Sequence, residues 1–380
     1  MNKLKLLTVA ALTLSLAACQ AAPGGQQDGQ KESEAPTSQE SKPAKTDSGA
    51  GVKAPEEGTA TPAVALADVD IDDEEAWQQE EAYGQKIKVV YAGGLCTAPA
   101  GIALSQGFYE DEGLDVELVK SEGASADAVG TGQAQVGADH ITSILVPLVN
   151  GVNAQIVGGV HTGCKSLYVM NDSDIESTED LKGQTIAIHN GIGQSDHNIA
   201  LRFLKADGIT AEEVNFKDVD TSATIQAMEN GELQGSIFTD QFAQPFVEEG
   251  KLRRIRGLSF DEDFKDETCC AIVVNKDFAK ENPITAKKMA RAIRKAANWV
   301  EDNKEDFIED LFANNWASGD KDAALAYAKT LNFAVPLEST GETVEHVIND
   351  YKALHIFNEN EDTAAIMKHV WSPADSHNFE

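Results

Sequence analysis

The feature that most constrains this chain is a regular alternation of short strand-like and longer helix-like segments between residues 86 and 275. The run Lys86 to Tyr91 predicts a strand that ends at Gly93-Gly94, and Ala98 to Gln106 predicts the helix that follows it. Further strands are predicted at residues 114–119, 134–138, 155–160, 166–170, 185–189, 214–219, 235–238, 252–255 and 271–274. Further helices are predicted at residues 125–131, 141–150, 195–206 and 222–230, and over most of 283–369. This alternation predicts an α/β protein with mostly parallel sheets, whose ligands bind at the carboxyl ends of the strands.

The length and the charge of the chain narrow its function. A chain of 380 residues exceeds one ordinary hydrophobic core, so we expect two lobes. Its 31 Lys and Arg residues are outnumbered by 63 Asp and Glu residues, which gives a formal net charge of -32. Phosphate backbones and anionic lipid surfaces are held by clusters of Lys and Arg. The charge therefore excludes nucleic-acid binding, and also adsorption to a membrane by charge alone.

The N-terminus has the pattern of an export signal. In residues 1–18, two lysines precede the apolar run Leu6 to Leu16, which is shorter than the about 20 residues that a membrane-spanning helix needs. The run ends in Leu-Ala-Ala followed by Cys19, which resembles a bacterial lipobox. The resemblance implies that Cys19 is lipidated and that the protein is extracytoplasmic and membrane-anchored. The alternative is ordinary cleavage, which leaves a free cysteine.

The segment after the lipobox has the composition of a linker. Residues 19–85 are rich in Gly, Gln, Ser, Pro and acidic residues, and such a segment buries too little apolar surface to offset the entropy of ordering. We expect a lipidated cysteine followed by a disordered acidic linker up to residue 85. Within it, Leu66 to Tyr83 has scattered apolar residues compatible with a short helix.

The loop after the first strand has residues suited to ligand contact. In Gly93 to Pro99, two glycines let the backbone approach a ligand, and Cys96 and Thr97 are candidate contacts. Thr97 is also expected to cap the following helix. The alternative is a tight turn without a ligand.

A second loop precedes the helix predicted at 195–206. Its residues Gly193, Gln194 and Ser195 are candidate ligand contacts, because the amides at a helix N-terminus can hold sulfonate, nitrate or carboxylate. The loop lacks the third glycine of a dinucleotide fingerprint. The alternative is a plain N-cap by Ser195.

Two acids and a histidine follow predicted strands. Asp139-His140 and Asp240 come directly after short strands, where a carboxylate can accept a hydrogen bond from an amine or a ring N–H of a ligand. The alternative is a solvated or helix-capping acid. Tyr91, Phe238 and Phe242 could stack on a planar ligand, but core packing is the favoured role of each.

Three segments in order resemble a known family. They are Gly-Phe-Tyr-Glu-Asp-Glu-Gly-Leu-Asp-Val-Glu-Leu at 107–118, Asp-Leu-Lys-Gly-Gln-Thr-Ile-Ala at 180–187, and Met-Glu-Asn-Gly-Glu-Leu at 228–233. Together they resemble the solute-binding proteins of ABC importers, in the family that binds nitrate, sulfonates, taurine and thiamine-pyrimidine precursors. The resemblance covers about residues 86–330.

The resemblance implies a two-lobed type 2 periplasmic-binding-protein fold with a hinge and an inter-lobe ligand cleft. Residues 86–172 and 270–380 would form the first lobe and 173–269 the second, with the hinge near Asn171-Asp172 and near Thr268. It also implies a monomer that binds a small molecule without a cofactor and partners an ABC permease and its ATPase.

The cysteines are the unusual feature of this implied fold. Cys96, Cys164 and the pair Cys269-Cys270, with His161 nearby in sequence, would converge on the cleft. Three interpretations stay open: disulfides, as expected of an exported protein; reduced and buried small hydrophobes; or a site for a soft or borderline metal or metal complex. Neither a CxxC nor an HxxxH spacing supports the metal site.

The favoured function is capture of a small sulfonate, taurine, nitrate or pyrimidine precursor without chemistry. The sequence has no Ser-His-Asp elbow, Walker loop or paired catalytic carboxylate motif. The alternative is a metal or metal-chelate binding protein that uses the cleft cysteines and histidines. Less favoured are an enzyme of thiamine-pyrimidine synthesis, since relatives of this fold use a longer cysteine motif for it, and a sensor or adhesion domain.

Overall fold

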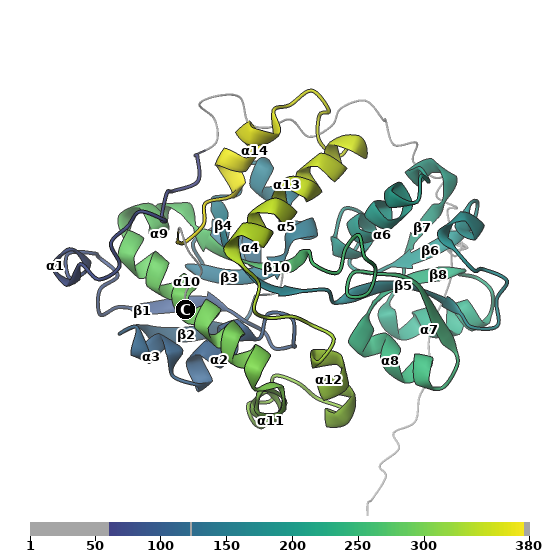
Figure 1. The fold of residues 1–380 in the computed structure, drawn as a ribbon, viewed down its shortest axis with the longest axis horizontal. Coiled ribbons are helices and arrows are strands. Elements are labelled where there is room, and N and C mark those ends of the chain that lie inside the picture. Colours follow the sequence, from purple (N-terminus) through teal and green to yellow (C-terminus); the bar gives the residue numbers. More distant parts are fainter. Residues whose placement is uncertain (1–60, 122–123, 376–380) are drawn as a thin grey trace, which may run out of the picture. The chain divides into compact units, whose positions relative to one another are not determined.

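The computed structural model describes residues 61–121 and 124–375 (Figure 1). The predicted signal peptide and the lipidation site Cys19 lie outside these residues. Within the described part, no helix is both long and apolar enough to cross a bilayer.

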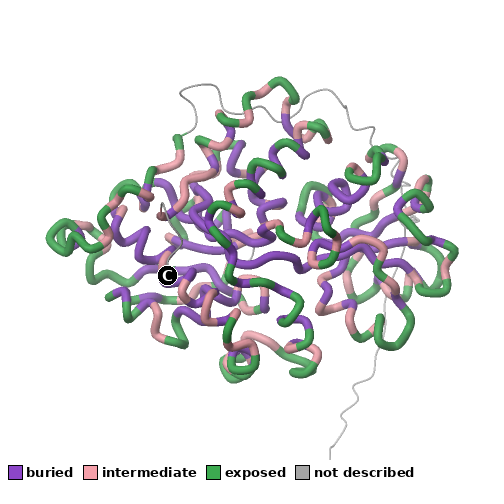
Figure 2. Tube along the Cα trace, viewed as in Figure 1, coloured by how far each residue is buried: buried purple, intermediate pink, exposed green. Residues whose placement is uncertain are grey.

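The first sheet has five strands in the order β2-β1-β3-β10-β4. Strand β1 (Lys86–Val90) runs parallel to β2 (Asp115–Val119) and β3 (Val136–His140). Strand β10 (Thr268–Asn275) runs antiparallel to β3 and to β4 (Ala154–Thr162). Every residue of β4 and β10 is buried, and Figure 2 shows this buried centre.

Helices cover both faces of this sheet. Because side chains alternate along a strand, Ile272 packs into the cluster that contains Met289, while Val273 packs into the cluster that contains Ile144 and Val347. The helices associated with the first sheet are α2 (Pro99–Ser105), α3 (Phe108–Asp111), α4 (Ser125–Gly130), α5 (Ile141–Val149), α9 (Lys276–Glu281), α10 (Pro283–Asp302), α11 (Lys304–Ala313), α12 (Lys321–Ala328), α13 (Leu337–Ala353) and α14 (Thr363–Val370).

The second sheet also has five strands, in the order β7-β6-β8-β5-β9. Its strands are β5 (Lys165–Met170), β6 (Thr185–Ile188), β7 (Asn215–Asp218), β8 (Gly235–Thr239) and β9 (Leu252–Gly257). Its helices are α6 (Ser195–Ala206), α7 (Thr221–Glu229) and α8 (Asp240–Glu248). The predicted α/β class and two-sheet organisation are confirmed, and each predicted strand is present within a few residues.

Two predictions about the sheets are wrong. The sheets are mixed rather than mostly parallel, because β5 and β10 enter their sheets from the other sheet and not through a helical crossover. Residues 165–172 were predicted to belong to the first lobe. Instead, strand β5 hydrogen-bonds to β8 and β9 and is part of the second sheet. The chain first crosses between the sheets at Gly163-Cys164, ahead of Asn171-Asp172, and it returns between β9 and Thr268. An apolar strand pattern does not reveal which sheet the strand joins.

The linker prediction is also wrong for residues 61–85. Leu66 is fully buried and Trp77, at the end of α1 (Glu74–Trp77), is 7% exposed. Trp77 Nε1 donates to Thr285 Oγ1 at 2.9 Å, and the Glu80 carboxylate accepts the backbone N–H groups of Ile284 and Thr285 at 2.6 and 2.8 Å. The segment therefore packs on α10 and caps its first turn. The acidic average composition hides these few anchoring side chains.

Buried ion pairs join the second sheet's α6 to the first sheet's α13. Arg202 Nε lies 2.6 Å from Asp350 Oδ2, and its other two nitrogens hold the Glu267 carboxylate at 2.8 and 2.9 Å. Asn198 Nδ2 donates to the Thr142 carbonyl at 2.8 Å. These contacts fix one side of the region where the chain crosses between the sheets.

We predict that Trp77→Ala lowers the free energy of unfolding by about 3–5 kcal/mol, because the substitution leaves a cavity against α10. Phe260→Ala is the control: Phe260 is an aromatic residue with 38% exposure, and its replacement is expected to cost about 1 kcal/mol or less. Urea unfolding of the full chain measures both. Equal, small losses would show that residues 61–85 do not pack as described.

Candidate functional site

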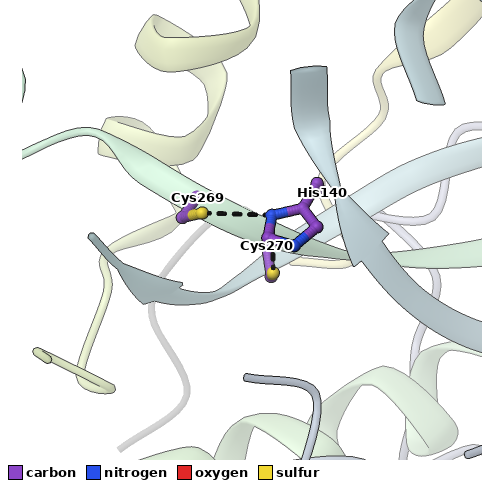
Figure 3. A group of neighbouring side chains, drawn as sticks. All are labelled: His140, Cys269 and Cys270. Atoms are coloured by element: carbon purple, nitrogen blue, oxygen red, sulfur yellow. Dashed lines mark hydrogen bonds between the residues drawn. The ribbon is translucent and has the colours of Figure 1, made fainter. Parts of the chain in front are cut away.

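Four side chains with metal-ligating atoms meet where the chain crosses between the sheets. His140 ends β3, Cys164 directly precedes β5, and Cys269 and Cys270 lie near the start of β10. His140 Nδ1 is 3.3 Å from Cys269 Sγ and 3.5 Å from Cys270 Sγ (Figure 3). It is also 3.9 Å from Cys164 Sγ, and the sulfur atoms of Cys164 and Cys269 are 3.0 Å apart. We call these four residues the thiol–imidazole cluster.

An irregularity of β10 allows two adjacent cysteines to share this cluster. Successive side chains of a regular strand point to opposite faces of the sheet. In the ladder between β10 and β4, Thr268 pairs with Thr162 and Cys270 pairs with His161, so Cys269 is an extra residue. Such a bulge re-aims a side chain. Both sulfur atoms therefore face the same imidazole nitrogen.

Cys164 has an unusual backbone that its neighbours hold in place. Its φ angle is 106°, in the region that favours glycine. Its N–H donates to Ser259 Oγ at 3.0 Å, and its carbonyl accepts the N–H of Asp240 at 3.0 Å and the hydroxyl of Tyr327 at 3.5 Å. These three contacts fix the position of its thiol.

Cys96 and His161 lie beside the cluster. Cys96 Sγ is 3.5 Å from the Tyr327 hydroxyl, and its electrostatic neighbours are Cys164 and His161. His161 is fully buried in β4, and its Nδ1 lies 2.8 Å from the carbonyl of Thr162. Its Nε2 has no hydrogen-bond partner among the residues that the structure describes.

The cluster is uncharged in the absence of a ligand. All four cysteines of the described part are free thiols. Burial raises the pKa of Cys270 to about 12, and it raises the pKa values of Cys164 and Cys269 well above their usual range. Burial, reinforced by the nearby Lys165, lowers the pKa of His140 well below its usual range. Three protonated thiols and a neutral imidazole are the result.

A buried cation, Lys165, adjoins these groups. It is 6% exposed, pairs with the Asp196 carboxylate, and donates to Ser195 Oγ at 2.8 Å. Burial alone would lower its pKa, but the charge of the Asp196 carboxylate and the hydrogen bond to it raise the pKa. Lys165 is therefore charged next to the cluster.

In the loop at residues 193–195, which was predicted to hold an anion, some of the polar groups already have partners within the protein. Ser195 and Asp196 form the first turn of α6, and Asp196 Oδ2 accepts the N–H of His189 at 3.2 Å. The N-cap is Gln194, whose side chain makes no capping hydrogen bond, so the alternative of a cap by Ser195 does not hold. Gly193 and Gln194 remain exposed.

The predicted acids have partners within the protein. Asp139 accepts the N–H groups of Ser125 and His140 at 3.0 and 2.8 Å. Asp240 accepts the hydroxyls of Tyr168 and Ser259 at 2.7 and 3.2 Å. Burial raises the pKa of both carboxyl groups.

The first predicted loop packs mainly against its own lobe. The N-cap of α2 is Ala98 without a side-chain hydrogen bond, so the prediction that Thr97 caps this helix is wrong. Gly94 N–H donates to the Trp316 carbonyl at 2.7 Å, and a Cβ on Gly93 would lie 2.8 Å from that oxygen. Cys96 and Thr97 are half-buried.

The aromatic residues weighed as stacking partners lie mostly in the core. Tyr91 donates to the Gly94 carbonyl at 2.9 Å and is 4% exposed. Phe238 is 1% exposed and stacks on His189 with ring centroids 5.4 Å apart, whereas Phe242 is half-buried.

Sequence reasoning missed several partners of the cluster. His140 was expected to contact a ligand beside Asp139, but His161 was taken as the histidine of a metal site. Strand register explains the difference, because Cys270 lies opposite His140 on one side of β10 and opposite His161 on the other. Tyr327 and Ser259 had no sequence signal. Lys165 did have a sequence signal, because a lysine at the start of an apolar strand indicates a buried charge that needs a partner.

Little open volume adjoins the thiol–imidazole cluster. A cavity of about 490 Å³ lies at the edge of the second sheet, lined by residues that include Met170, Met228 and Lys251, and it does not touch the cluster. A cavity of about 10 Å³, roughly one water, adjoins Gly163 and Cys269.

Comparison with known proteins identifies relatives of this chain. The family model described as NMT1/THI5 like matches residues 97–306. The putative binding protein YtlA of Bacillus subtilis is 26% identical over 264 residues, which cover 65% of this chain and 75% of YtlA. The 4-amino-5-hydroxymethyl-2-methylpyrimidine phosphate synthase THI11 of Saccharomyces cerevisiae is 23% identical over 223 residues. That match covers 53% of this chain and 62% of the yeast protein, less than two thirds of its length.

Among solved structures, the periplasmic aliphatic sulphonate binding protein SsuA of Escherichia coli has a similar fold. The TM-score is 0.62 at 16% sequence identity, and the match covers 78% of this chain and 94% of SsuA. This likeness confirms the predicted periplasmic-binding-protein fold.

We predict that iodoacetamide modifies Cys164, Cys269 and Cys270 only slowly in the native, metal-free protein at pH 8, because the thiolate is the reactive form and burial keeps these thiols protonated. The rate for Cys270 should still rise about tenfold per pH unit between pH 9 and 11, as its thiolate fraction grows toward a pKa of about 12. Cys96 should also react slowly although it is half-buried, because its hydrogen bond with Cys164 and burial raise the pKa of its thiol. Peptide mapping by mass spectrometry measures each site. Failure of Cys164 and Cys269 to react even after unfolding without reductant would reveal a disulfide instead.

Proposed function

Because this chain belongs to the NMT1/THI5-like family and has the fold of periplasmic solute-binding proteins, we propose that it is the solute-capturing component of an ABC importer. The observation that carries the proposal is that side chains from the ends of strands in both sheets meet at the two chain crossings. In open α/β sheets, ligands bind outside the carboxyl ends of the strands. A small solute held there would contact both sheets at once.

We select the proposed solute contacts from the predicted site residues by how far each side chain or backbone group is exposed. Gln194 and Gly193 after β6 are exposed, and Thr97 after β1 and His140 at the end of β3 are half-buried, so these groups are open to a solute. Asp139, Ser195 and Asp240 already have partners within the protein and would act mainly by holding the site in shape.

Solute capture of this kind requires no chemistry. A ligand that contacts both sheets favours the arrangement in which they are close, and it shifts the population by its difference in affinity for the two arrangements. A permease and its ATPase would then receive the loaded form. We propose binding rather than catalysis, since the resemblance to the yeast synthase covers a smaller part of both chains than the resemblance to YtlA.

The family resemblance supports sulfonates, taurine, nitrate or pyrimidine precursors as solutes. Because Lys165 is already paired with Asp196, this buried cation is not free to pair with an anionic solute, and this makes the anions on the list less favoured. We also propose that Cys19 is lipidated and that a linker before residue 61 tethers a monomer outside the cytoplasm, on the lipobox-like sequence alone.

We predict that one member of a panel containing taurine, an alkanesulfonate, nitrate and an aminopyrimidine raises the melting temperature of the full chain and binds in calorimetry with a stoichiometry of one. Gln194→Ala should weaken that binding about tenfold, the effect of losing one hydrogen bond of about 1.4 kcal/mol. Gln226→Ala, an exposed glutamine on α7 of the same lobe, should leave the affinity unchanged. Equal effects of the two substitutions would contradict a site at the α6 N-terminus.

A further inference from the structure

We propose that His140, Cys164, Cys269 and Cys270 form a binding site for one thiophilic metal ion, for which Zn²⁺ is the natural probe. Thiolate sulfur and imidazole nitrogen are the ligands that Zn²⁺ prefers, and Cys₃His is one of its common ligand sets. The ligand atoms of His140, Cys269 and Cys270 all lie within 4.8 Å of one another. Cys164 Sγ adds a fourth donor, 3.0 Å from Cys269 Sγ and 3.9 Å from His140 Nδ1.

The distances suit a shared ion. Zn–S and Zn–N bonds are about 2.3 and 2.0 Å long, so on one tetrahedral zinc two sulfur donors lie about 3.8 Å apart and a sulfur and a nitrogen about 3.5 Å apart. The distances from His140 Nδ1 to the three sulfur atoms, from 3.3 to 3.9 Å, are close to that value, and the sulfur atoms of Cys164 and Cys269, 3.0 Å apart, would separate slightly. An ion placed among the four donors would therefore need small side-chain movements and no rearrangement of the strands.

The backbone is built to aim these donors at one point. The bulge at Cys269 turns two adjacent thiols toward the same imidazole, which a regular strand does not do. Cys164 adopts a φ angle of 106° that costs free energy in a non-glycine residue. Its N–H donates to Ser259, and its carbonyl accepts hydrogen bonds from Asp240 and Tyr327, which together hold it there. Both irregularities occur at residues whose side chains enter the cluster.

The charge of a metal thiolate sets the cost of burying it at this site. Zn²⁺ with three thiolates and a neutral imidazole carries a net charge of -1, which is costly to bury without a compensating cation. The nearest cation is the Lys165 ammonium, which interacts electrostatically with Cys164, Cys269 and His140. Because Lys165 is already paired with Asp196, it offsets only part of that charge. Binding would release the thiol protons, because only the deprotonated thiol ligates the metal.

A disulfide accounts for fewer of these observations. Cys164 and Cys269 are close enough to be oxidised to a disulfide after a small movement. That bond would leave Cys270 and His140 buried beside it without a role. The metal site uses all four groups, together with the bulge that brings Cys270 into place.

The proposed ion site shares His140 with the proposed solute site. The inference that the ion, alone or in a small complex, is the imported solute rests on the proposed function, whereas the binding itself does not. A site that includes Cys164 at the first crossing and strand β10 at the second would couple the bound ion to the relative movement of the two sheets.

We predict that the reduced, metal-free full chain binds one equivalent of Co²⁺ with the thiolate charge-transfer and visible bands of a tetrahedral site, and that Zn²⁺ displaces it. Cys164→Ser, Cys269→Ser, Cys270→Ser and His140→Ala should each weaken Zn²⁺ binding by at least about tenfold. Cys96→Ser is the matched control, because Cys96 is the remaining described cysteine and lies outside the ligand set. It should bind Zn²⁺ within about twofold of the unsubstituted protein.

Several results would overturn the assignment. They are the absence of Co²⁺ binding by the reduced protein, full affinity in the Cys269→Ser and Cys270→Ser variants, and loss of the metal in Cys96→Ser. Should the variants fail to fold, zinc X-ray absorption on the unsubstituted protein decides: three sulfur neighbours and one nitrogen support the site, and only nitrogen and oxygen neighbours refute it. The solute panel is tested in a chelator, so that failure of the metal site and failure of the importer proposal remain separate results.

Discussion

The rest of the structure depends on the two places where the chain crosses between its sheets. At Gly163-Cys164 the chain leaves the first sheet, and at Thr268 it returns, so each sheet includes one strand that runs against its neighbours. Two crossings constrain the sheets to move about a common line. They also bring residues about a hundred positions apart, such as Cys164 and Cys269, into contact. Fold and candidate site thus have the same origin.

Buried charge at the crossings is paired, and this pairing limits what the site can bind. Lys165 is held by Asp196, and Arg202 is held by Asp350 and Glu267. Each pair needs both partners, because a single buried charge costs several kcal/mol. The uncharged groups between these pairs are thiols and an imidazole. Near neutral pH the thiols gain charge when they lose protons to a metal, and the imidazole binds a metal as a neutral ligand, so metal binding is a chemistry that suits all of these groups.

Much of the fold could be predicted from the sequence, because strand and helix periodicity are local properties. The strands from β1 to β10 were found within a few residues, whereas the helices α3, α8 and α9 were missed. Sheet membership was not predictable, since the apolar pattern of β5 fits either sheet. Site chemistry was predicted in part: the cysteines were identified, but the bulge at Cys269 and the register that opposes His140 to Cys270 are long-range features. Trp77 was missed because an acidic average hid one anchoring side chain.

The central claim is that the cluster at the crossings holds the cargo of a solute-binding protein. Native mass spectrometry of the full chain, isolated without chelator or reductant, tests it most directly. We predict a bound mass, lost on denaturation, that is absent from the Cys269→Ser/Cys270→Ser double variant. A protein whose mass lacks any adduct and is lighter by the hydrogens of a disulfide would contradict the claim. So would an adduct that the double variant retains in full.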